Sequence, residues 1–127
     1  MRGIDPLFVY ALVGLESNFD PHARRGEARG LLQLKPEAWR AASDIPYEPA
    51  VWDWRTNLEV GIDRLATLKR ALTARGVFSY PRLWATHQYG FDYVAARDFD
   101  MSRIDRPDNA IAVRMWRGDV EPVNPPK

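Results

Sequence analysis

The chain has 127 residues, a length that suits one domain and is short for two separate cores. Its 18 basic and 17 acidic residues nearly cancel, which disfavours a dedicated nucleic-acid-binding protein. The lack of cysteine excludes disulfides, thiolate metal sites and thiol nucleophiles. We expect one globular domain over residues 1–118, held together by packing, and a proline-rich tail or linker over 119–127.

The first predicted helix runs from about Pro6 to Ser17. Asp5 can cap its first amides, Pro6 suits its first turn, and apolar residues recur at helical spacing. Its apolar run is about half of the roughly 20 residues that a membrane span needs. Asp5 and Pro6 precede the run and Glu16 ends it, whereas a signal peptide has basic residues before its apolar stretch and small residues after it. We therefore expect a core helix there, with neither a membrane span nor an export signal.

The segment PHARRGEARG, residues 21–30, contains one proline and two glycines, so it is predicted to be a basic surface loop. The clearest helix follows later: it begins at a capping box of Thr56 and Glu59, carries an apolar stripe and ends at Gly76. The sequence predicts three shorter helices: one entered at Pro36, one over 80–90, and one ending near Gly118. No alternating strand pattern of useful length is present, so the predicted class is mostly α.

The common signatures of metal, serine-nucleophile and phosphate-binding sites are absent. His22 and His87 are far apart in sequence, and there is no HExxH, GxSxG or GxxxxGK motif. We expect neither a metal nor a cofactor. Acid–base chemistry by carboxylates remains as the catalytic possibility.

Glu16 is the candidate acid–base carboxylate, because it ends the longest apolar run of the chain. If this helix end is screened from water, desolvation favours the neutral acid, which is the form that donates a proton. The negative end of the helix acts in the same direction. A solvated glutamate at a helix end is the alternative interpretation, and the local spacing does not decide between the two.

Several motif blocks around Glu16 resemble one known family. ESNFDPHARRGEARGLLQLKP resembles the ES-x-F-x-P … GA-x-GLMQ-x-x-P signature of the lysozyme-like soluble lytic transglycosylases (SLT), which are relatives of goose-type lysozyme. WDWRTNLEVGIDRL is similar to the family's D-P-x-x-NI-x-x-G-x-x-YL segment, and WATHQYG stands where the family usually has A-x-AYNAG. The resemblance covers roughly residues 4–94 and implies a lysozyme-like, goose-type fold.

The sequence also departs from this pattern. The departures are Arg24 for the family's loop serine, Glu27 for a glycine, Leu32 for a methionine and Arg64 for a tyrosine. Glycan contacts at these places are therefore open. The HQYG segment, residues 87–90, resembles the corresponding segment in the phage-lysin and secretion-associated branch of the family, which implies an endolysin or virion protein.

The resemblance implies a peptidoglycan lytic transglycosylase without metal or cofactor. Glu16 would be its catalytic residue, cutting the β-1,4 bond between N-acetylmuramic acid and N-acetylglucosamine to leave a 1,6-anhydromuramyl end. The partner would be the glycan strands of peptidoglycan, in the bacterial cell wall or periplasm. The protein would act as a monomer or as part of a longer chain. The residues assigned to substrate binding are Ser17, Gly30, Leu32, Gln33, His87, Gln88, Tyr89 and Tyr93.

Other interpretations of the same residues remain open. A hydrolase (muramidase) on this fold would need a carboxylate such as Asp53 or Asp92 to activate water, although both also suit surface or cap positions. A catalytically weak wall-binding module is the third possibility. Among the aromatic residues, Trp39, Trp84 and Trp116 are assigned to the core, whereas Trp52 and Trp54 fit either a groove wall or packing.

Overall fold

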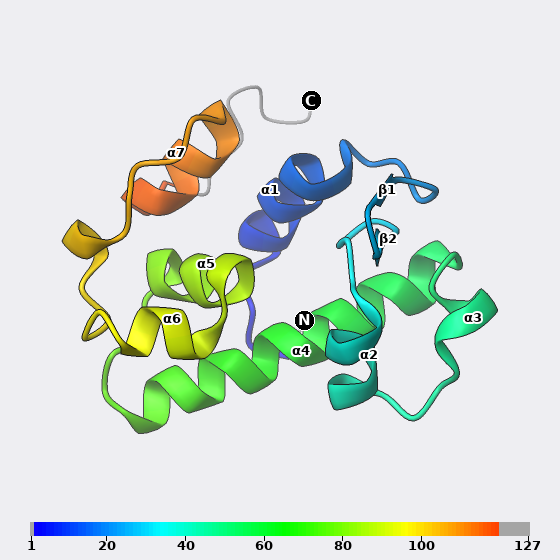
Figure 1. Ribbon diagram of the computed structural model, residues 1–127, viewed down its shortest axis with the longest axis horizontal. Helices are drawn as coiled ribbons and strands as arrows, with labels where there is room; N and C mark the ends of the chain where they lie inside the picture. Colours follow the sequence, from blue (N-terminus) through cyan, green and yellow to red (C-terminus); the bar gives the residue numbers. More distant parts are fainter. Residues whose placement is uncertain (1, 120–127) are drawn as a thin grey trace. The chain divides into compact units, whose positions relative to one another are not determined.

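The computed structural model describes residues 2–119 (Figure 1). This part of the chain contains seven α-helices, one 3-10 helix and a two-stranded sheet, so the mostly α prediction is confirmed. The elements group into two compact units, one up to Arg64 and the other from Leu65 onward. Of the predicted tail over 119–127, only Asp119 lies within the described residues.

Helix α1, Pro6–Ser17, has the bounds that the sequence predicted. The Asp5 side chain accepts a hydrogen bond from the Leu7 amide at 2.9 Å, and Pro6 occupies the first turn, where no amide proton is needed. The helix ends at Asn18, which adopts the left-handed conformation with φ 52°. No helix among residues 2–119 has the length and apolar character that crossing a membrane requires.

The basic loop after α1 contains a small hairpin that the sequence did not predict. Strands β1, Arg24–Arg25, and β2, Ala28–Arg29, pair antiparallel, with Arg25 opposite Ala28. Gly26 lies between them with φ +59°, a conformation that glycine adopts at little cost. Strands of two residues are too short to show the alternation on which a strand prediction depends.

Helices α2, Pro36–Ala42, and α3, Tyr47–Ala50, lead to the long helix α4, Trp54–Ala74. The prediction that α4 begins at a Thr56 capping box was wrong. Asp53 caps it instead: its Oδ1 accepts from the amides of Arg55 at 3.0 Å and Thr56 at 3.3 Å. A carboxylate directly before the first turn reaches these amides, so the helix starts three residues earlier than predicted.

The core of the first unit is apolar, as the packing-only prediction requires. Trp39 is fully buried, which confirms its assignment to the core, and its indole nitrogen donates to the Ile45 carbonyl at 2.7 Å. Other fully or almost fully buried side chains of this unit are Phe8, Leu12, Leu32, Leu34 and Val51.

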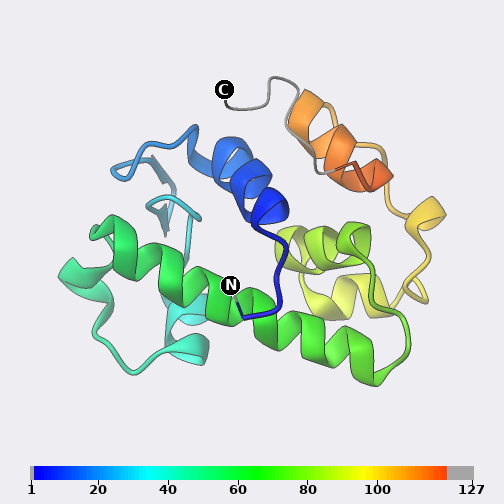
Figure 2. The same ribbon diagram turned by 180° about the vertical axis from the view of Figure 1, so that it is seen from behind.

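The second unit contains the end of α4 and four further elements. These are α5, Tyr80–Tyr89; α6, Phe91–Ala95; the 3-10 helix η1, Met101–Arg103; and α7, Ala110–Arg117. Helix α5 packs against both α6 and α7, and α5 and α6 lie side by side from either direction (Figures 1 and 2). Gly90 and Gly118 end α5 and α7 as predicted.

The tryptophans of this unit differ in burial. Trp84 is almost completely buried, which confirms its core assignment. Trp116 is half-buried, and its indole nitrogen donates to the Ile104 carbonyl at 3.1 Å. It therefore packs at the margin of the core.

Candidate functional site

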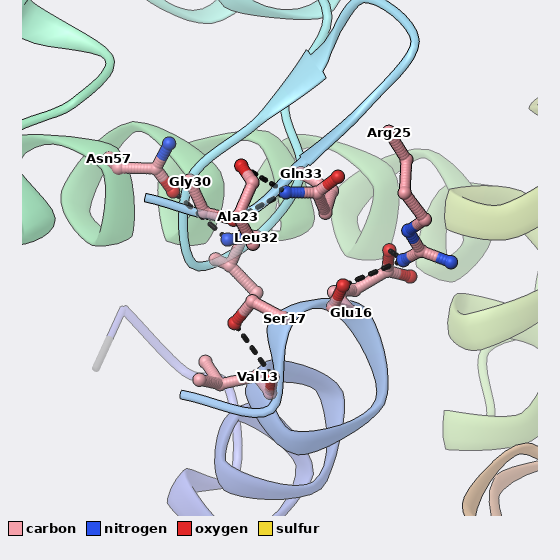
Figure 3. Close-up of polar contacts among 9 residues, drawn as sticks. All are labelled: Val13, Glu16, Ser17, Ala23, Arg25, Gly30, Leu32, Gln33 and Asn57. Atoms are coloured by element: carbon pink, nitrogen blue, oxygen red, sulfur yellow. Dashed lines mark hydrogen bonds and ion pairs between the residues drawn. The ribbon is translucent and has the colours of Figure 1, made fainter. Parts of the chain in front are cut away.

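Glu16 lies in the last turn of α1, and its side chain is only 10% exposed. Arg25, from strand β1, donates through Nη2 to the Glu16 Oε2 at 3.0 Å and to the Glu16 main-chain carbonyl at 2.7 Å (Figure 3). The Arg25 side chain is itself 64% exposed. The carboxylate singled out by the sequence is therefore screened from water and paired with an accessible guanidinium.

A second cation, Arg64 on α4, lies within electrostatic range of Glu16. Burial lowers the pKa of the Arg64 guanidinium below its usual range, and the negative charge of Glu16 acts in the opposite direction. The sequence showed Arg64 only as a departure from the family's tyrosine. Its relation to Glu16 joins residues that lie far apart in the sequence, so no local signal reports it.

Asn57, on α4, forms hydrogen bonds to the backbone of the loop that precedes α2. Its side chain is fully buried; Oδ1 accepts from the Leu32 amide at 3.0 Å, and Nδ2 donates to the carbonyls of Arg29 at 3.0 Å and Val51 at 3.1 Å. The sequence predicted no role for this residue. An asparagine on the apolar side of a long helix was the available signal, because a buried amide needs partners.

Two of the predicted binding residues, Gly30 and Leu32, lie in close packing contact with α4. Gly30 has φ +81°, and a Cβ there would overlap the Asn57 side-chain amide. Leu32 is almost fully buried, and Gly61 of α4 leaves the space that its side chain fills. These residues shape the loop from within.

Gln33 carries a buried acceptor without a partner. Its Nε2 donates to the carbonyls of Ala23 and Gly30, each at 2.9 Å, whereas its Oε1 is buried and makes no hydrogen bond. The residue is 9% exposed and has φ +50°, a conformation that costs a non-glycine residue about 1 kcal/mol or more. The Gln33 Oε1 is therefore a candidate acceptor for an N–H or O–H group of a ligand, because buried polar atoms usually have a hydrogen-bond partner.

Ser17 is buried beside Glu16, and its hydroxyl donates to the Val13 carbonyl one turn back at 3.0 Å (Figure 3). This back-bond satisfies the hydroxyl proton within α1. The geometry thus favours a structural role for Ser17 at the helix end.

The other four predicted binding residues belong to the second unit. His87, Gln88 and Tyr89 form the end of α5, and Tyr93 lies in α6. The rings of Tyr89 and Tyr93 have centroids 5.0 Å apart and a tilt of 32°. Tyr89 is 38% exposed; burial raises the pKa of its phenol, with smaller contributions from Tyr93 and Asp105. These tyrosines form a partly exposed aromatic pair.

The two tryptophans left open by the sequence differ in surroundings. Arg29 lies over the rings of Tyr47 and Trp52, each at 5.4 Å, and forms an ion pair with Glu48, so Trp52 takes part in packing. Trp54 is 51% exposed, with Arg55 over its ring at 5.3 Å. Trp54 remains available to a ligand.

The carboxylates considered for water activation have local structural positions. Asp53 caps α4 through two backbone amides, and Asp92 lies exposed in the first turn of α6. Across residues 2–119 there is no group of three or more His, Asp or Glu side chains arranged to hold a metal ion. The expectation of a metal-free and cofactor-free protein stays a prediction.

Comparison with models of protein families, with curated proteins and with solved structures finds no match to the chain. The resemblance to the SLT family therefore rests on the motif residues themselves.

Proposed function

We propose that this chain is a peptidoglycan lytic transglycosylase with a goose-type, lysozyme-like architecture, acting on glycan strands of the bacterial cell wall. The observation that carries the proposal is the position of Glu16. It is a carboxylate screened from water at the end of α1, within the segment that resembles the family's ES-x-F-x-P motif.

In the first step, Glu16 in its acid form donates its proton to the oxygen that links C1 of N-acetylmuramic acid to N-acetylglucosamine. The C1–O bond breaks, and the N-acetylglucosamine end of the strand leaves with the proton. The muramyl 2-acetamido oxygen stabilises the positive charge that develops at C1, so no protein nucleophile is needed.

In the second step, Glu16 is a carboxylate and takes the proton of the muramyl C6 hydroxyl. The C6 oxygen bonds to C1, which closes a 1,6-anhydro ring and returns Glu16 to the acid form. No water is consumed. One residue thus serves as acid and then as base.

Gln33 supplies a binding group for this reaction. The unpartnered Gln33 Oε1 can accept a hydrogen bond from an acetamido N–H, a donor that each sugar of the strand carries. In this proposal, Gln33 orients the sugar whose bond Glu16 cleaves.

A wall-binding module without catalysis is the second candidate, and one observation favours it. The ion pair between Arg25 and Glu16 needs the carboxylate, whereas the first step needs the acid. In a protein that only binds, this pair would simply persist. A hydrolase has less support, because Asp53 is engaged in capping α4.

The deciding experiment is digestion of purified peptidoglycan by the wild-type chain and by Glu16→Gln, with products identified by chromatography and mass spectrometry. We expect muropeptides one water lighter than ordinary ones from the wild type and none from the variant. Reducing-end products would identify a hydrolase. Glycan binding without any released product would identify the binding module.

A further inference from the structure

The side chains around Glu16 carry an excess of positive charge. Arg25 pairs with Glu16 directly, and Arg64 lies within electrostatic range, so these three side chains sum to one positive charge. Arg24 and Glu27, on the same hairpin as Arg25, are exposed and cancel each other. Among these five side chains one positive charge is left over, which favours an additional anion.

Arg25 loses its ion pair with the Glu16 side chain when the proposed reaction begins, although its hydrogen bond to the Glu16 main-chain carbonyl at 2.7 Å does not depend on that charge. The first step needs Glu16 protonated, and a neutral acid no longer forms an ion pair with the guanidinium. Arg25 is 64% exposed, and the hairpin backbone beneath it is held by its pairing with Ala28 and by the bond from the Gly30 amide to the Ala23 carbonyl at 2.9 Å. The guanidinium can thus change partner while the backbone stays in place.

We propose that Arg25 is a specificity-determining residue that exchanges Glu16 for a carboxylate of the glycan. The planar guanidinium matches a carboxylate through two parallel hydrogen bonds, and charge-assisted bonds of this kind are the stronger ones in proteins. This inference rests on the proposed function, because it takes the substrate to be a muramyl glycan.

The muramyl sugar offers one carboxylate near the reacting bond. Its lactyl group is attached at C3 of the same ring whose C1–O bond is broken, whereas the other acids of the wall lie further out on the peptide stem. In the intact wall the lactyl carboxyl is amide-linked to that stem and carries no charge. The preferred substrate is then a strand from which an amide-cleaving hydrolase has already removed the peptides.

The test begins with binding, measured calorimetrically on the full-length protein. The probe is the disaccharide of N-acetylglucosamine and N-acetylmuramic acid with a free lactyl carboxylate, which lacks the bond to be cut; the matched probe is its neutral methylamide. We expect the wild type to bind the free acid about tenfold more tightly than the amide. Arg25→Gln should abolish this difference, and Arg24→Gln, on the neighbouring exposed arginine, should keep it.

Arg25→Lys retains the charge but not the planar fork, so part of the preference should survive in that variant. Circular dichroism on each variant confirms folding before binding is compared. Equal binding of both probes by the wild type would overturn the inference. A preference that persists in Arg25→Gln would do the same, because it would assign the recognition to another group.

Cleavage of stem-free strands, with free or methylamidated carboxylates, separates this inference from the proposed function. Release of anhydromuramyl products from both kinds of strand, without a binding preference, overturns the role of Arg25 and leaves the reaction in place. A carboxylate preference without any released product supports the recognition and removes the enzymatic proposal.

Discussion

Asn57 is a fully buried amide with three hydrogen bonds to main-chain groups. Asn57→Ala leaves the Leu32 amide and the Val51 carbonyl without this partner, whereas the Arg29 carbonyl keeps the bond from the Leu34 amide at 3.0 Å. Because each buried group left unpaired costs roughly 1 kcal/mol or more, we expect a loss of about 2 kcal/mol in the free energy of unfolding. Urea denaturation followed by circular dichroism measures it.

Glu59→Ala is the matched control for Asn57, since Glu59 is exposed on the same helix. Its free energy of unfolding should stay within about 0.5 kcal/mol of the wild-type value. Equal effects of the two substitutions would mean that the Asn57 bonds contribute nothing beyond helix propensity.

Asp100 gives stability a dependence on pH. Its carboxylate accepts from the Ser102 hydroxyl at 2.7 Å and the Ser102 amide at 3.0 Å, and these bonds hold the pKa of Asp100 below its ordinary value. A carboxyl whose pKa is lower in the folded state stabilises the fold above its unfolded-state pKa. That contribution is lost as the pH falls through the folded-state pKa.

The matched change is Ser102→Ala, which removes the hydroxyl donor and keeps the amide. We expect the pKa of Asp100 to rise toward its ordinary value, as followed by NMR titration of its carboxyl carbon. The wild-type advantage in unfolding free energy over this variant should shrink on acidification. An unchanged Asp100 titration in the variant would show that the hydroxyl bond has no effect.

At the scale of elements, the start of α4 shows which residue caps the helix. The sequence predicts a capping box of Thr56 and Glu59, yet Asp53 makes the capping bonds. We expect Asp53→Ala to lower the free energy of unfolding by about 1 kcal/mol and Thr56→Ala by only a few tenths. Urea denaturation of both variants checks the order, and the reverse order would restore the Thr56 box.

The elements show what local sequence information predicts well and poorly. The start of α1 and the ends of α5 and α7 follow from Asp5, Gly90 and Gly118, whose effect reaches only the neighbouring turn. The β1–β2 hairpin went unpredicted because its two-residue strands show no alternation. Short helices such as α3 and α6 likewise lack enough residues to show a helical period.

At the scale of the whole molecule, α4 contributes residues to both compact units, since the division falls between Arg64 and Leu65. A fragment ending at Arg64 keeps about half of the 21 residues of α4. Isolated helices shorter than about 12–15 residues are marginal in water. We expect this fragment to have little helical circular dichroism and no cooperative thermal transition.

The control is a fragment that ends at Ala74 and retains all of α4. It should have more helical signal per residue than the shorter fragment. Native-like helicity and a cooperative transition in the shorter fragment would show that the first unit folds without the second half of α4.

The sequence by itself determined the mostly α class, the bounds of α1, the burial of Trp39 and Trp84, and the position of Glu16 at the end of the apolar helix. These depend on caps, helix breakers and apolar spacing, which act over a few neighbouring residues. Only the tertiary structure decided that Glu16 pairs with Arg25, that Asn57 holds Leu32, and that the Gln33 oxygen is left without a partner. The Glu16–Arg25 and Asn57–Leu32 contacts join residues that lie apart in the chain, and only the packing of the folded chain brings them together.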